Sequence, residues 1–113
     1  MVTYEQVRDF ALTLPGVEEG TSYGTPALKV RGKLLARLHE NGALVVRVGA
    51  DAQEALLAME PEVYFITPHY AGGWAILVRL DIIEDAAMRS LIVETWRGNA
   101  PKRLVAASEQ DMS

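Results

Sequence analysis

Residues 27–48 contain three short runs in which apolar and polar side chains alternate, and two tight-turn signals separate the runs. The first signal centres on Gly32, and the second is the dipeptide Asn41-Gly42. Strands joined by such short turns pair antiparallel with their neighbours. The segment therefore predicts an antiparallel meander and argues against a doubly wound parallel sheet.

Alternation in the first two runs predicts that this sheet has one apolar face and one solvated face that carries basic side chains. The apolar face has to pack against other elements, and the solvated face stays open to water. We expect Leu28, Val30, Leu34, Ala36 and Leu38 on the apolar face, and Lys29, Arg31, Leu35, Arg37 and His39 on the other.

Three other segments have the pattern of helices. The first spans residues 4–13, and Thr3 followed three positions later by Gln6 is a capping-box signal at its start. The second is short, with Asp51 as its expected N-cap. The third follows residues 81–85 and is broken at residues 99–101, with one further turn expected at 102–107. The expected buried positions of the second and third helices are Leu56, Leu57, Met59, Met88, Leu91, Ile92, Thr95 and Trp96.

Two more strands are expected at residues 63–67 and 74–80, with Trp74 at the head of the apolar face of the second. The element order is α-β3-α-β2-α, which predicts a two-layer α+β fold with an antiparallel sheet packed against helices. Residues 1–107 are expected to form a single domain, and residues 108–113 a frayed C-terminal tail.

Composition narrows the functional classes. A chain of 113 residues that is 50% hydrophobic can bury a core without metals or disulfides. It contains no cysteine, which excludes disulfides, thiolate zinc sites and cysteine nucleophiles. The N-terminal residues lack the basic and apolar regions of a signal peptide, so we expect a cytoplasmic protein with no membrane partner.

Motifs for catalysis are missing from the sequence. The serines have no G-x-S-x-G context, no phosphate-binding glycine loop is present, and the only histidines are His39 and His69. His69 is chemically able to act as a general base, but no partner is apparent beside it. The sequence therefore predicts a protein that is not an enzyme, with no catalytic residues, no metal and no cofactor.

An aromatic loop is one candidate binding site. His69, Tyr70 and Trp74 offer an imidazole, a phenol and an indole close together, which suit stacking and hydrogen bonding to a ligand. The alternative is structural: Tyr70 and Trp74 belong to the core, and His69 is a loop residue bonded to backbone.

Basic side chains form the second candidate site, although the net charge of the chain is −4. Around the Gly32 turn the lysine and arginine side chains form a positively charged strip that is able to lie along a phosphate backbone. The alternative is a solvated outer face that also protects a sheet edge. The candidate nucleic-acid-binding residues are Lys29, Arg31, Lys33, Arg37, Lys102 and Arg103.

Three segments together resemble the MmcQ/YjbR family: residues 23–38, 63–80 and 96–106. The resemblance implies a secretion-chaperone-like α+β fold and a double-wing, DNA-binding domain without catalytic residues. The wings would be the hairpin around Gly32 and the loop at residues 69–73. The matching motifs are Val30-Arg31-Gly32-Lys33, Thr67-Pro68-His69-Tyr70 with Trp74, and Pro101-Lys102.

The sequence and the resemblance together predict a monomeric, non-enzymatic domain that binds DNA. The alternative is a module that binds a small ligand or a protein partner through the His69-Tyr70 loop and the exposed sheet face.

Overall fold

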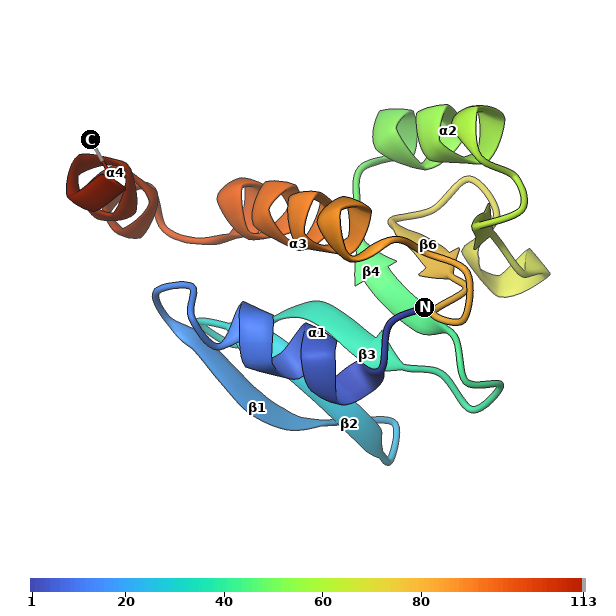
Figure 1. Cartoon of the computed structure of the whole chain (residues 1–113), viewed down its shortest axis with the longest axis horizontal. Coiled ribbons are helices and arrows are strands. Elements are labelled where there is room, and N and C mark those ends of the chain that lie inside the picture. The colour runs from blue at the N-terminus through green and yellow to red at the C-terminus, as the bar shows by residue number, and fades with distance from the viewer. Residues whose placement is uncertain (113) are drawn as a thin grey trace.

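A computed structural model of the chain describes the backbone of residues 1–112 and the side chains of residues 1–107 (Figure 1). The six strands form one open antiparallel sheet in the order β1-β2-β3-β4-β6-β5. The elements are α1 (Tyr4–Ala11), β1 (Val17–Ser22), β2 (Thr25–Val30), β3 (Lys33–Leu38), β4 (Leu44–Arg47), α2 (Ala50–Met59), β5 (Tyr64–Phe65), the 3-10 helix η1 (Pro68–Tyr70), β6 (Ala75–Val78), α3 (Asp85–Asn99) and α4 (Lys102–Met112).

The predicted fold class is confirmed: helices pack on one face of an antiparallel sheet. The main core lies between that face and helices α1 and α3, and it buries Trp96, Met88 and Ile92 from α3. Thr3 caps α1 in the predicted capping box with Gln6. Within the described residues, no helix has the length and apolar character needed to cross a bilayer.

The sheet has one strand more than the predicted order α-β3-α-β2-α. From sequence, residues 17–24 are expected to form either a short edge strand or an irregular segment, because they are rich in Glu and Gly, which are depleted in strands. They form β1 because a two-residue turn at Tyr23 and Gly24, with φ of 53° and 77°, folds the chain back along β2. Pairing then runs from Val17 opposite Val30 to Ser22 opposite Thr25.

Strand β3 departs from simple alternation. Leu28 pairs with Ala36 and Lys29 pairs with Leu34, which leaves Leu35 as the extra residue of a β-bulge. Leu35 is therefore 1% exposed in the main core, and Leu34, which was assigned to the core face, is only half-buried. The predicted faces of Leu34 and Leu35 were wrong because no residue pattern announced the bulge.

Two details of α2 and β6 also differ from prediction. The N-cap of α2 is Gly49, so Asp51 lies in the first turn, and Met59 is 73% exposed instead of buried. Trp74 precedes β6 and is 40% exposed. β6 itself is buried on both faces, so it does not need Trp74 to complete an apolar face.

A smaller apolar cluster covers part of the opposite sheet face. The η1 turn folds over that face and places Tyr70 on it. This second cluster explains why β4 and β6 are buried on both sides although the helices cover only one. Its members are Ala43, Val45, Tyr70, Ala75 and Leu77, with Phe65 at its border.

Pro101 separates α3 from α4, as the break predicted at residues 99–101 requires. α4 is longer than the single turn that was expected, since it runs from Lys102 to Met112. A frayed tail was predicted at residues 108–113. The side chains of these residues lie outside the described part of the chain, and so does Ser113 as a whole. That expectation stays a prediction.

Candidate nucleic-acid interface

The turn between β2 and β3 carries two of the predicted basic residues. Arg31 and Gly32 both have positive φ, 51° and 83°, as a two-residue turn between antiparallel strands requires. Glycine adopts this conformation readily, and arginine does so at some energetic cost. Arg31 and Lys33 are both exposed, so the turn holds two cations away from the sheet.

Helix α4 brings a second pair of cations to the same end of the molecule. Gly16 lies between the two segments: a Cβ built on it would be 2.9 Å from Leu104 Cδ1 and 3.4 Å from Val30 Cγ2. Leu104 follows Lys102 and Arg103, and Val30 precedes Arg31. The start of α4 therefore packs beside the end of β2. We call Arg31, Lys33, Lys102 and Arg103 the basic end.

No ion pair joins the basic end to a carboxylate within the described residues. All four of its side chains belong to exposed residues. Arg97, in the last turns of α3, lies 3.6 Å from the Glu94 carboxylate, so its charge is partly balanced. The basic end thus keeps its positive charge available although the chain as a whole is acidic.

Lys29 has a different environment. It lies in β2 directly opposite Glu18 of β1 and is half-buried. An acidic side chain in the facing position lowers the positive potential that Lys29 presents to solvent. We therefore leave Lys29 out of the basic end.

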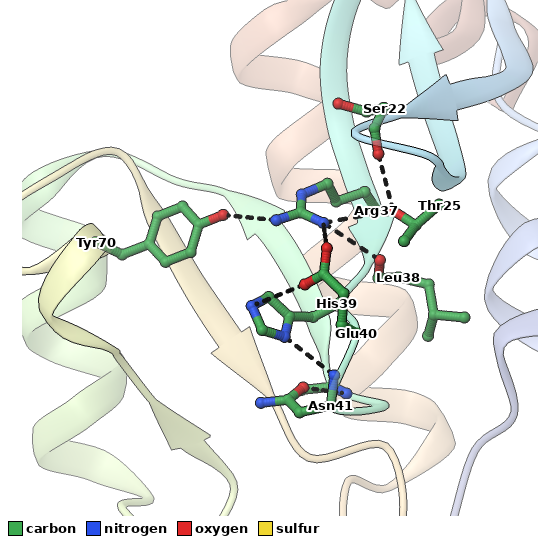
Figure 2. A network of polar contacts seen from close by, with 9 residues as sticks. Ser22, Thr25, Arg37, Leu38, His39, Glu40, Asn41 and Tyr70 are labelled. Atoms are coloured by element: carbon green, nitrogen blue, oxygen red, sulfur yellow. Dashed lines mark hydrogen bonds and ion pairs between the residues drawn. The ribbon is translucent and has the colours of Figure 1, made fainter.

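Arg37 is buried on the sheet face that η1 covers, with 5% of its surface exposed (Figure 2). Its guanidinium donates to the Tyr70 hydroxyl at 3.0 Å and to Thr25 Oγ1 at 3.4 Å, and it lies 3.6 Å from Glu40 Oε1. The Tyr23 ring lies 5.1 Å from its Cζ. These contacts fasten η1 to the strands. Arg37 is an anchor for the loop and has little surface with which to meet a phosphate.

The loop end of this network is more open to water. Glu40 lies 3.4 Å from His39 Nε2, and the Asn41 amide donates to His39 Nδ1 at 3.2 Å. The pKa of the Glu40 carboxyl is lowered, first by a hydrogen bond from its own backbone amide and then by the charges of His39 and Arg37. Glu40 is therefore ionised and partly neutralises Arg37.

The three aromatic residues of the candidate loop differ in burial. Tyr70 is 4% exposed, whereas His69 and Trp74 are exposed. Tyr70 meets His69 and Trp74 edge-to-face, with ring centroids 4.8 and 5.5 Å apart. The structural alternative placed both Tyr70 and Trp74 in the core. The structure agrees with it for Tyr70 and disagrees for Trp74.

The aromatic loop lies far from the basic end. Figure 1 shows α4 at one end of the molecule and the β5–β6 region, which contains this loop, at the other. The structure does not bring the loop and the basic end together.

Replacing Tyr70 with phenylalanine is expected to destabilise the domain by about 2 kcal/mol, because it removes a hydrogen bond to a buried cation. The measurement is the free energy of unfolding in urea. Tyr23→Phe is the matched control: Tyr23 is 82% exposed, so we expect a change within about 0.5 kcal/mol. Equal effects of the two substitutions would show that the contact to Arg37 does not fasten the loop.

Comparison with known proteins gives the family. The family model described as YjbR matches residues 12–98. The chain belongs to the YjbR family. Over 53 residues, 47% of this chain, it is 55% identical to an uncharacterized protein of Mycobacterium bovis and to uncharacterized proteins of two Mycobacterium tuberculosis strains. The match spans 41% of the length of each of these relatives.

A solved structure has the same fold as this YjbR domain. The crystal structure of the Deinococcus radiodurans protein DR2400, with a DUF419 domain, superposes with a TM-score of 0.71 at 19% identity. The superposition covers 85% of this chain and 77% of that protein. At this identity the likeness concerns the fold alone.

Sequence reasoning missed two features of this YjbR domain. One is Tyr23, whose ring lies beside Arg37. The available signal for the turn that holds Tyr23 was Gly24, the next residue in the chain. Gln53 was also missed: the residue is 4% exposed, and its side-chain amide donates to two backbone carbonyls. A polar residue on a short, alanine-rich helix carries no sequence signal for such a role.

Proposed function

We propose that this YjbR domain is a non-enzymatic nucleic-acid-binding protein that contacts the DNA backbone through its basic end. The observation that supports the proposal most is the packing of Leu104 beside Gly16 and Val30, which joins two basic segments far apart in sequence. Four exposed cations without carboxylate partners in the described part of the chain are suited to phosphates.

The charge distribution defines what kind of binding to expect. The acidic remainder of the molecule repels DNA, so only orientations that present the basic end are attractive. Such contacts act on the phosphate backbone and carry no sequence information by themselves. We expect weak, sequence-independent binding whose salt dependence corresponds to about three or four phosphates.

Titration of a fluorescent DNA duplex with the protein, followed by anisotropy at several KCl concentrations, tests this. Log affinity should fall with log salt concentration with a slope of about −3 to −4. The double substitution Arg31→Gln with Lys33→Gln should weaken binding and reduce the steepness of that slope by about 2, since each lost phosphate contact contributes about 1.

The matched control is Arg8→Gln with Arg89→Gln, which removes the same number of positive charges from residues that pair with Asp9 and Asp85. Because those arginines are already neutralised locally, the control should keep the wild-type slope. A duplex that does not bind at tens of micromolar protein in low salt would refute the proposal. Equal losses of DNA affinity in both double variants would show that binding depends on the net charge of the protein and not on the basic end.

A further inference from the structure

A pocket of about 690 Å³ lies at the end of β3 that points away from the basic end. Strand β3 begins at Lys33, in the basic end, and ends at Leu38, which lines the pocket. The N-terminal residues form one wall, where the Val2 amide donates to Leu80 O at 2.7 Å. The volume falls in the range of about 300 to 1,000 Å³ that is usual for small-molecule sites.

Most of the lining of this pocket is apolar, as is usual for ligand sites. Leu38 of β3 and Phe65 of β5 both line it, and both are half-buried. The domain therefore leaves part of each side chain in contact with water. An apolar molecule placed in the pocket would cover that surface.

Arg79 brings a positive charge to the pocket. It directly follows β6, lines the pocket and is half-buried. Its guanidinium carbon lies 4.2 Å from the centre of the Phe65 ring, which lines the same pocket. Aromatic rings pack well against guanidinium groups, so Phe65 supports the cation at the pocket wall.

The Arg79 guanidinium has no acceptor among the described residues: it makes no hydrogen bond there and no ion pair. Four other arginines each lie within 3.6 Å of a carboxylate, namely Arg8, Arg37, Arg89 and Arg97. Arg79 therefore keeps its N–H donors available to a molecule in the pocket. The fork of donors in a guanidinium matches the two oxygens of a carboxylate.

The charges of the pocket favour an occupant with a single negative charge. Its charged side chains are Arg79 and Asp81, and no ion pair joins the two. Asp81 is exposed, so water and salt screen its charge more than that of the half-buried Arg79. A carboxylate is therefore attracted overall, whereas the second charge of a phosphate dianion would add repulsion from Asp81.

We propose that this pocket binds a small molecule with one carboxylate and an apolar body. Arg79 holds the carboxylate, and the body lies against Leu38 and the accessible part of Phe65. The site shares no residue with the basic end, so this proposal and the proposed contact with DNA can fail independently.

Naphthoate is a suitable probe because it joins one carboxylate to an apolar ring system, and naphthamide is its neutral counterpart. Titration of the full chain, followed by NMR of the backbone amides, should give saturable shifts at the pocket, for example at Gly42 and Leu80. Naphthamide should bind about tenfold more weakly, the usual size of a lost hydrogen bond between charged groups. Naphthyl phosphate should also bind more weakly than naphthoate, because its second charge faces Asp81.

Arg47 provides the matched control. It is also half-buried, and its guanidinium carbon lies 5.5 Å from the centre of the Trp74 ring, but it does not line this pocket. Arg79→Gln should weaken naphthoate binding by about tenfold and leave naphthamide binding unchanged, whereas Arg47→Gln should change neither. Asp81→Asn should strengthen naphthoate binding by about twofold, a gain that damage to the fold would not produce.

Circular dichroism checks that the three variants are folded. Absence of saturable shifts at the pocket in the wild-type protein would overturn the proposal. So would naphthamide or naphthyl phosphate that binds as tightly as naphthoate. A folded Arg79→Gln variant with wild-type affinity for naphthoate, or an equal loss in Arg47→Gln, would also overturn it.

Discussion

Replacing Gln53 with leucine is expected to destabilise the domain by about 3 kcal/mol, because two buried backbone carbonyls each lose a hydrogen bond. Gln53 Nε2 donates to Tyr70 O at 2.8 Å and to Ala75 O at 2.7 Å, so one side chain of α2 ties η1 to the start of β6. Leucine has nearly the same volume and keeps the packing, so the loss reports the hydrogen bonds rather than a cavity.

Urea unfolding measures this loss, and amide hydrogen exchange locates it. We expect the fastest increase in exchange at the Tyr70 and Gly73 amides, because their bonds to Thr67 and Tyr70 close the loop that Gln53 supports. Gln6→Leu is the control at an exposed glutamine that makes only capping contacts at α1, where a cost of about 1 kcal/mol is expected. A Gln53→Leu protein as stable as this control would mean that the loop is held mainly by Tyr70 packing.

The parts of the fold that sequence predicted are those that local chemistry decides. The capping box at Thr3 and the turns at Gly32 and Gly42 are specified by residues within a few positions of each other. The buried positions of α3, among them Met88 and Ile92, follow from helical spacing alone. None of these predictions required knowledge of the rest of the chain.

The failures have tertiary causes. Leu35 enters the core because β2 and β3 shift register, which depends on how the two strands meet. Arg37 was placed on the correct sheet face, but it is buried because η1, more than thirty positions later in the chain, closes over it. Trp74 was expected to face the core because alternation was extended one residue beyond the strand that forms. Strand pairing decides the burial of Leu35 and a distant loop that of Arg37, whereas the exposure of Trp74 follows from where its strand begins.

The candidate sites show the same division. The members of the basic end were all named from sequence, but their union depends on Leu104 packing beside Gly16, a contact between the two ends of the chain.

Truncation of Trp96 is expected to have the largest effect on stability. The side chain is 2% exposed in the main core, so Trp96→Ala should cost about 3 to 5 kcal/mol through lost burial and the cavity left behind. Trp96→Phe keeps most of the packing but loses the bond from Nε1 to Pro15 O, 2.9 Å long, and should cost about 1 to 2 kcal/mol. Urea unfolding of both variants separates packing from hydrogen bonding.

The Trp96 bond also bears on the proposed function, since Pro15 immediately precedes the Gly16 against which α4 packs. Loss of the bond should loosen the α1–β1 connection, so Trp96→Phe should bind duplex DNA more weakly than wild type while still folded. Trp74→Phe is the matched control, because that ring is 40% exposed at the other end of the sheet. If Trp96→Phe kept wild-type stability and DNA affinity, the bond to Pro15 would not position the basic end. If Trp74→Phe lost DNA affinity to the same extent, the aromatic loop would be part of the interface.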